Sequence, residues 1–338
     1  MRVFIYEYVC GGGLVGRPLP DSLAREGWAM LRSIVEDFER VERCEVVTTL
    51  DERYIGRQLA TRKFEVVTCR EDERRAIERR AGDCEWTLII APEFENVLLD
   101  RVAWAEQVGG QLLGSSSRGV AIAGDKFLCG QTLEQAGVPA VVGQVIQIAE
   151  GAPSHVSVKF PAVLKPRVGA GSQHTFLVPD ADSLTRIIRQ AADEGLHGDA
   201  LLQPFLAGKP ASVSLLVGSS DIVPLLAGEQ VLSHGGRFTY LGGRIPLESD
   251  ESARAIDLAS HAVACVPGLK GYVGVDLVLG PDVVIEINPR LTTSYVALRV
   301  LCEENLARLM VLHCECGSIP PVRWKAGKVC FQPDGSLA

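Results

Sequence analysis

The sequence lacks several features that define other classes of protein. It has 34 lysines and arginines against 42 aspartates and glutamates, a net charge of -8 and no basic cluster. We therefore do not expect nucleic acid as a partner, because phosphate neutralisation needs dense positive charge. No apolar run reaches transmembrane length, and Glu7 interrupts the first one, so we expect neither a membrane span nor a signal peptide.

Paired cysteine spacings are also missing. The ten cysteines are scattered singly from Cys10 to Cys330 in a chain of 338 residues, which indicates reduced thiols and a cytoplasmic location. With 47% hydrophobic residues and no low-complexity tract, the chain can bury substantial cores and is expected to form two or three compact lobes. The sequence does not determine the oligomeric state, and a homodimer is compatible with it.

The first 114 residues alternate predicted strands and helices, which indicates a parallel sheet covered by helices. Ligands gather beyond the carboxyl ends of such strands. Glu7 and Glu93 follow two of the strands and are candidate substrate contacts, with a surface or capping role as the alternative. Gly11–Gly13 lacks the G-x-G-x-x-G spacing and is expected to form a flexible loop on the substrate side. The predicted strands span residues 3–8, 45–48, 66–68 and 86–91, and the helices 22–40 and 71–81.

A predicted hairpin in the middle of the chain has the composition of a phosphate site. Its strands span residues 158–165 and 173–178, and its loop contains Gly169, Ala170, Gly171 and Ser172. Small residues allow backbone N–H groups to close on phosphate oxygens, although a plain turn is the alternative. Lys165 lies in an apolar strand, where a buried ammonium needs an anionic partner such as a polyphosphate.

Three further segments are candidates for ligand contacts. Lys126 opens a predicted helix, although it could be only a solvated helix residue. The 200–206 strand is interrupted by glutamine and proline, where free backbone groups could bind a purine. Residues 228–243 are rich in glycine and polar side chains and are expected to form a substrate loop, with Arg237 and Arg244 as carboxylate or phosphate partners.

The segment 271–290 predicts a β-hairpin with a turn at residues 280–282. With that loop Leu279 faces Val283, and the ladder sets Asp276 directly opposite Glu286. The opposite face is apolar and must be buried, which determines the register. The predicted apolar face consists of Val275, Leu277, Leu279, Val283, Ile285 and Ile287.

Facing carboxylates predict a metal site. Two carboxylates in this arrangement have Cβ atoms about 5 Å apart and repel each other unless a cation neutralises them. Asp276, Glu286 and Asn288, two residues further along the same face, offer hard oxygen ligands suited to Mg²⁺. A solvated polar face is the alternative. Arg290 follows the strand end, where its guanidinium could hold a phosphate or an oxyanion.

The ordered set of these motifs resembles the ATP-grasp ligases over about residues 115–310. No single motif is decisive, but their order and spacing together are specific. The matching segments are Asp125-Lys126, Lys165-Pro166, Gly169–Ser172, Gln203–Gly208, Asp276 and Glu286–Arg290.

The resemblance implies an α/β and α+β architecture, namely an ATP-grasp fold with an N-terminal parallel α/β (pre-ATP-grasp) domain. The implied divisions are 1–114 for the substrate-side domain, 115–200 for the small lobe and 201–338 for the C-terminal lobe. It also implies ATP and Mg²⁺, with Mn²⁺ as an alternative metal, and small-molecule carboxylate and amine substrates.

The resemblance also implies roles for individual residues. Lys126 and Lys165 would contact the ATP phosphates beneath the 169–172 loop, and Arg290, with Lys165, would act on the transferred phosphoryl group. The ribose contact is not identified, because Lys209 follows the linker glycine where many members carry an acid. The implied adenine contacts are Gln203, Pro204, Phe205 and Leu206, and the implied metal ligands are Asp276, Glu286 and Asn288.

Short identities in the N-terminal region are similar to the tyramine–glutamate ligases of methanofuran biosynthesis. This similarity implies phosphorylation of the glutamate γ-carboxylate and attack by tyramine, giving γ-glutamyltyramine, ADP and phosphate. One alternative is an ATP-grasp ligase for another amino acid or a peptide, and another is a nucleotide-binding regulatory module without turnover. The identities are Glu7-Tyr8, Gly11–Gly13, Glu26-Gly27, Met30-Leu31, Asp37-Phe38 and Ala91–Glu93.

Overall fold

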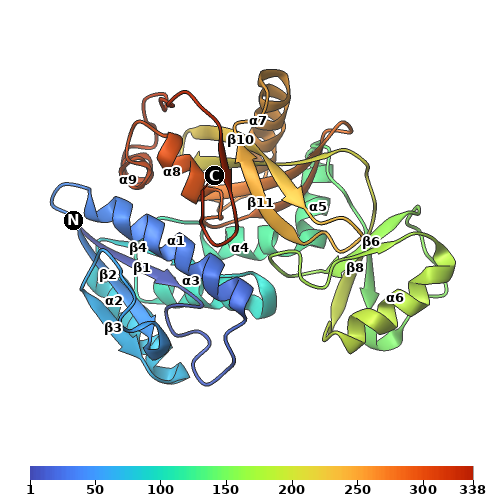
Figure 1. The fold of residues 1–338 in the computed structure, drawn as a ribbon, viewed down its shortest axis with the longest axis horizontal. Helices are drawn as coiled ribbons and strands as arrows, with labels where there is room; N and C mark the ends of the chain where they lie inside the picture. The colour runs from blue at the N-terminus through green and yellow to red at the C-terminus, as the bar shows by residue number, and fades with distance from the viewer. Residues whose placement is uncertain (338) are drawn as a thin grey trace.

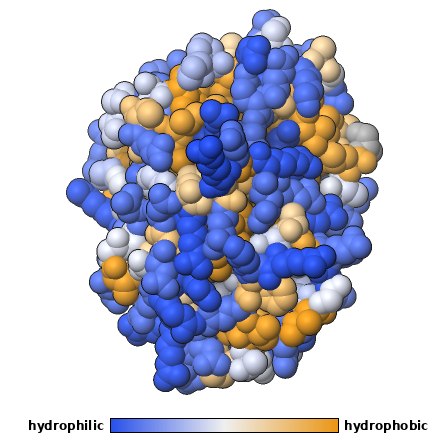
Figure 2. All heavy atoms as spheres, turned by 90° about the vertical axis from the view of Figure 1, so that its left-hand side faces the viewer, coloured by the Kyte–Doolittle hydropathy of each residue, from blue (hydrophilic) through white to orange (hydrophobic). Residues whose placement is uncertain are grey.

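The computed structural model describes residues 1–337 and contains three β-sheets. Figure 1 shows the N-terminal unit and a small lobe on opposite sides of a central C-terminal sheet. On the face drawn in Figure 2, hydrophilic side chains cover most of the surface and hydrophobic ones occur in separate patches. Within residues 1–337, no helix is both long and apolar enough to span a membrane.

The N-terminal sheet is parallel throughout, with the strand order β3-β2-β1-β4, as the alternation of strands and helices predicts. All six elements predicted for this region are present. The structure adds α3, which the sequence interpretation missed. The strands are β1 (Arg2–Glu7), β2 (Glu45–Asp51), β3 (Phe64–Val67) and β4 (Trp86–Ile90), and the helices are α1 (Asp21–Glu39), α2 (Arg70–Asp83) and α3 (Val97–Gln107). The region also contains two short 3-10 helices, η1 (Glu52–Tyr54) and η2 (Phe94–Asn96).

The small lobe is an antiparallel sheet of order β5-β8-β6-β7 with α6 packed against it. Its two predicted hairpin strands exist but are shorter than expected, because β6 begins only after Pro161, which has no N–H to donate. The elements are β5 (Gln144–Gln147), η3 (Ile148–Glu150), β6 (Ala162–Pro166), β7 (Phe176–Val178), α6 (Ala181–Asp193) and β8 (Asp199–Pro204).

The C-terminal sheet has the order β13-β12-β9-β10-β11-β14 and is antiparallel. One face packs on α7 in an apolar cluster that includes Val213, Val275, Ala259 and Ala262. The strands are β9 (Lys209–Val217), β10 (Ile222–Leu232), β11 (Tyr240–Ile245), β12 (Gly271–Leu279), β13 (Val283–Asn288) and β14 (Val329–Phe331). The helices are α4 (Ser117–Gly124), α5 (Lys126–Gln135), α7 (Ser249–Ala264), α8 (Tyr295–Leu301) and α9 (Leu306–Cys316).

The predicted division of the chain into three parts remains a proposal. The packing of two helices, α4 and α5, bears on where the small lobe begins. Helices α4 and α5 precede the small-lobe sheet in sequence but pack against β13. Their side chains Ala123, Cys129 and Leu133 belong to the apolar cluster of the C-terminal sheet.

Residues 228–243 form mostly strands and not the predicted loop, although several of them line the large cavity described below. Most of this segment belongs to β10 and β11, and only 233–239 connects them. Two of its glycines, Gly228 and Gly242, allow close approach of neighbouring strands. A Cβ at Gly242 would lie 2.0 Å from the Phe331 carbonyl oxygen, and one at Gly228 would lie 2.6 Å from the Ile245 side chain.

The β12–β13 hairpin confirms the predicted pairing of its carboxylates. Asp276 pairs with Glu286, and Asn288 pairs with Gly274. The side-chain amide of Asn288 donates to Asp276 Oδ2 at 3.1 Å, which places all three polar side chains on one face.

The predicted pairing near the turn of this hairpin is wrong by one residue. Val283 pairs with Val278 rather than Leu279, and a β-bulge at Ile285 then restores the expected register. The bulge also changes which side chains are buried. Val284 joins the core, while Ile285 faces the large cavity described below.

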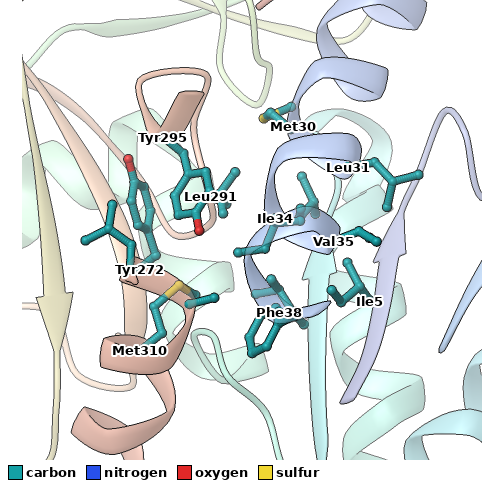
Figure 3. Close-up of a cluster of buried hydrophobic side chains, with 14 of the residues drawn as sticks. Ile5, Met30, Leu31, Ile34, Val35, Phe38, Tyr272, Leu291, Tyr295 and Met310 are labelled. Atoms are coloured by element: carbon teal, nitrogen blue, oxygen red, sulfur yellow. The ribbon is translucent and has the colours of Figure 1, made fainter. Parts of the chain in front are cut away.

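Helix α1 packs on both the N-terminal sheet and the C-terminal elements. Figure 3 shows Leu31 and Val35 of α1 near Ile5 of β1, with Tyr295 and Met310 on the other side of the helix. These residues belong to a single hydrophobic cluster. The N-terminal unit is therefore joined to the C-terminal elements through a continuous core.

Asp37 anchors the C-terminal half of α1. Its carboxylate accepts hydrogen bonds from Arg299 Nη2 at 2.6 Å and from the Tyr295 hydroxyl at 2.7 Å, and Asn305 donates to its backbone carbonyl at 2.7 Å. The Asp37 and Arg299 side chains are only 7% and 13% exposed.

We expect Asp37→Asn to lower the free energy of unfolding by about 3 kcal/mol, because the buried Arg299 guanidinium loses the carboxylate that accepts its hydrogen bonds and keeps only the ion pair with Glu36 at 3.3 Å. Urea unfolding measures this change. Glu39→Gln removes an exposed charge from the same helix and should change the stability by less than about 0.5 kcal/mol. Equal stabilities of the two variants would contradict the assigned role of Asp37.

Candidate active site

A cavity of about 660 Å³ lies between the small-lobe sheet and the C-terminal sheet. Strands β6 and β8 and the 169–172 loop line it on the small-lobe side, while β10 to β13 line it on the other. It brings together most of the residues singled out in the sequence, from segments far apart in the chain. These are Lys126, Lys165, Gly169, Ala170, Gly171, Ser172, Gln203, Pro204, Phe205, Leu206, Arg244, Asp276, Glu286, Asn288 and Arg290.

Lys126 connects three parts of the cavity wall. Asp125 caps the N-terminus of α5 by accepting from Phe127 N at 3.0 Å, which places Lys126 in the first turn. The Lys126 ammonium donates to the Gly169 carbonyl at 2.5 Å and lies 3.2 Å from Glu286 Oε2. Lys126 thus joins the small-residue loop to a carboxylate of the β12–β13 hairpin.

Lys165 points into the same cavity from β6 and is 7% exposed. Burial lowers the pKa of Lys165 to about 8, although the nearby Glu286 carboxylate opposes this effect. No ion pair or hydrogen bond of its ammonium group occurs within the described part of the chain. A buried ammonium without a direct partner favours an anionic ligand, such as a phosphate.

The facing carboxylates have different electrostatic surroundings. Asp276 accepts amide hydrogen bonds from Gln230 at 2.8 Å and from Asn288 at 3.1 Å. Burial, and then repulsion from Glu286, raises the pKa of Asp276 to about 7. Burial would also raise the pKa of Glu286, but Lys126 and Lys165 lower it.

These surroundings fit a divalent cation. Within residues 1–337 no lysine, arginine or histidine forms an ion pair with Asp276, and its carboxylate directly faces that of Glu286, so a metal ion would remove the repulsion that burial strengthens. Carboxylate oxygens and an amide oxygen are the ligands that Mg²⁺ prefers. The Asn288 amide now donates to Asp276, and its carbonyl oxygen can be presented instead by rotation of the amide.

Arg290 lines the cavity, and Glu93 holds it in place from behind. Glu93 Oε1 and Oε2 accept from Arg290 Nε at 2.9 Å and Nη2 at 3.1 Å. Burial would lower the pKa of Arg290, but Glu93 raises it, so the guanidinium stays charged. Glu93 was predicted as a substrate contact, and the structure instead places it behind the arginine and outside the cavity lining.

Arg237 also lies outside the cavity lining. It pairs with Glu194 at the end of α6 at 2.6 Å, and its guanidinium carbon lies 4.2 Å from the ring centroid of Phe176. The Leu177 N–H also donates to the Gly236 carbonyl at 2.8 Å. Arg237 therefore ties the 233–239 connection to the small lobe.

Glu7 is 2% exposed and does not line the cavity. Its carboxylate accepts from Cys10 N at 2.7 Å, beneath Gly27 of α1. The adjacent glycines are packed, because a Cβ at Gly12 would lie 2.5 Å from Val67. The expectation of a flexible loop over Gly11–Gly13 is wrong.

Several cavity residues were not singled out as site residues in the sequence. Glu26 of α1 is the most distant in sequence from the predicted motifs, and only tertiary packing brings it to the site, whereas Tyr240 of β11 lies within the predicted 228–243 segment. Glu26 was noted solely as part of a short identity. The others with polar side chains include Ser212, Ser214, Glu229, Gln230, Thr292 and Thr293.

The sequence of this chain is similar to those of known proteins. The sequence profile described as an ATP-grasp domain matches residues 123–294, and that of a pre ATP-grasp 3 domain matches 44–120. The chain is 26% identical over 317 residues to the tyramine–L-glutamate ligase of Methanocaldococcus jannaschii, covering 91% of this chain and 88% of that protein.

Solved structures have the same fold. A crystal structure from Archaeoglobus fulgidus, assigned to the ATP-grasp superfamily, has a TM-score of 0.71 and 27% identity, covering 98% of this chain and 92% of that one. The L-amino acid ligase of Bacillus licheniformis has a TM-score of 0.71 at 17% identity, with coverage of 98% and 79%.

The chain therefore belongs to the ATP-grasp family. It is a ligase that uses ATP and Mg²⁺ to join a carboxylate to an amine, releasing ADP.

We expect Glu7→Gln to change how stability depends on pH. Burial raises the pKa of Glu7 from 4.5 to about 7. The Glu7 contribution to stability is therefore complete below about pH 4.5 and is lost as the pH rises through about 7, a cost of about 3 kcal/mol above that pH. A neutral glutamine avoids this cost.

Urea unfolding of wild type and Glu7→Gln at about pH 5 and pH 8 measures the difference. The variant should gain about 2 to 3 kcal/mol relative to wild type between these two conditions. An identical stability difference at both pH values would contradict the raised pKa.

Proposed function

We propose that this ligase joins the γ-carboxylate of glutamate to the amine of tyramine. The observation that carries the reaction class is the meeting of two lysines, two facing carboxylates and Arg290 in one cavity. The substrate pair is supported by the similarity to tyramine–L-glutamate ligases over 91% of the chain.

We assign the lysines and the small-residue loop to ATP. Lys126 and Lys165 hold its phosphates, and backbone N–H groups of the 169–172 loop close over them. The 203–206 segment, which lines the cavity at the end of β8, contacts adenine. The Gln203 side chain donates to the Val141 carbonyl at 2.5 Å and so anchors this segment to the loop before β5.

Asp276, Glu286 and Asn288 would hold Mg²⁺. When bound, Mg²⁺ neutralises negative charge on the phosphate oxygens. Phosphoryl transfer depends mainly on such positioning and charge stabilisation, so the protein needs no covalent nucleophile.

The reaction has two steps. A γ-carboxylate oxygen attacks the γ-phosphorus of ATP, and the bond to ADP breaks. The tyramine ammonium releases one proton, and the neutral amine nitrogen then attacks the acyl carbon. A C–N bond forms, and phosphate leaves with the former carboxylate oxygen and with the second proton from the nitrogen. Arg290, fixed by Glu93, stabilises negative charge on the reacting carboxylate and the phosphoryl group.

The substrate pair is tested by measuring ADP release over a matrix of amino acids and amines, with mass detection of the products. We expect glutamate with tyramine to give the highest kcat/KM and a product with the mass of γ-glutamyltyramine. Turnover only with other pairs would show that the substrate assignment is wrong and would identify the true pair. ATP binding without ADP formation for any pair would instead indicate a regulatory module.

We expect Glu286→Gln to lower turnover by roughly 100-fold, because it removes one of two charges facing the cation and leaves Lys126 without its partner. Steady-state ADP release measures the effect, and circular dichroism verifies the fold. Glu315→Gln makes the same chemical change at an exposed position of α9 and should retain full activity. Wild-type turnover by Glu286→Gln would refute the metal assignment.

A further inference from the structure

Four carboxylates line the cavity. Three of them either have a cationic partner or are assigned to the metal ion. Glu286 pairs with Lys126, and Glu229 pairs with Arg244 at 3.2 Å. Asp276 is held by two amides at the proposed metal position. The fourth is Glu26.

Glu26 has no cationic partner among residues 1–337. Its Oε1 accepts a hydrogen bond from the Thr293 hydroxyl at 2.5 Å, and no lysine, arginine or histidine forms an ion pair with it. Arg290 is close by in sequence to Thr293 but has its own bidentate partner in Glu93. A carboxylate in a cavity with one free oxygen and no cation favours a cationic ligand.

The packing of α1 determines where Glu26 lies. Gly27 rests directly on Glu7, because a Cβ at this position would come within 2.6 Å of the Glu7 carboxylate. The C-terminal half of the helix is anchored by the ion pair between Asp37 and Arg299. Figure 3 shows α1 between the N-terminal sheet and the C-terminal elements. Glu26 therefore belongs to a supported helix and not to a free loop.

The contacts of Glu26 place it at the Arg290 end of the cavity. Glu26, Arg290 and Tyr240 line the same cavity. The Thr293 hydroxyl, which donates to Glu26, lies three residues after Arg290 in the chain. We assign Arg290 to the carboxylate and phosphoryl group, so Glu26 faces the reacting end of the site.

Both proposed substrates carry an ammonium group that must be held near Arg290. Tyramine brings the amine that attacks the acyl phosphate, and glutamate brings its α-ammonium. Resting on the proposed function, we propose that Glu26 binds an ammonium group of a substrate beside Arg290, with Thr293 orienting the carboxylate. Glu26 then determines specificity for charged amines, while Thr293 is a positioning residue.

The test is the kinetics of Glu26→Gln, with KM measured separately for tyramine, glutamate and ATP. Removing a charge-assisted hydrogen bond should raise the KM of one ammonium-bearing substrate by roughly 10- to 100-fold. The KM for ATP should change by less than about two-fold, because Glu26 is not among the residues that we assign to ATP. Thr293→Val should raise the same KM by a smaller factor.

Two arms identify which ammonium is bound. A raised KM for tyramine alone assigns the incoming amine. A raised KM for glutamate assigns the α-ammonium, and Glu26→Gln should then also lose the wild-type preference for glutamate over glutarate, which has no α-ammonium. Either outcome supports the proposal.

Glu39→Gln makes the same change on the same helix at an exposed position and should leave all three KM values unchanged. Unchanged KM values in Glu26→Gln would overturn the proposal. A parallel rise of all three KM values with a lowered melting temperature would also overturn it, by assigning Glu26 a purely structural role.

If the proposed function is wrong, the wild-type protein will be inactive with glutamate and tyramine, which is a different result from those above. The KM comparison would then use the pair found by the substrate matrix.

Discussion

Two carboxylates held face to face are the constraint on which the site depends. Asp276 and Glu286 pair across the β12–β13 ladder, and the apolar side of the same hairpin is buried in the core, so neither can turn away. Their repulsion must be relieved by positive charge. Lys126 and Lys165 supply part of it, and a metal ion fits the remainder.

The cavity is assembled from all three parts of the chain. The small lobe contributes Lys165 and the 169–172 loop, and the C-terminal sheet contributes the carboxylates and Arg290. The N-terminal unit contributes Glu26 directly and Glu93 through Arg290. Since α1 shares one core with the C-terminal elements, the N-terminal unit is positioned by packing as well as by these polar contacts.

The local sequence pattern was enough to predict most of the fold and the centre of the site. The buried apolar side of the hairpin determined the Asp276–Glu286 pairing, even though the turn was wrong by one residue and a bulge at Ile285 restored the register. Long-range partners were not predictable. Arg237 pairs with Glu194, and Glu26 reaches the cavity only because α1 packs on the C-terminal elements, which periodicity does not reveal.

The central claim is that this cavity activates a carboxylate by transferring a phosphoryl group to it. The most direct test is turnover of substrate whose reacting carboxylate carries ¹⁸O, with mass spectrometry of the released phosphate. Formation of an acyl phosphate predicts transfer of one ¹⁸O atom to each phosphate. Phosphate without ¹⁸O, released together with the amide product, would contradict the account.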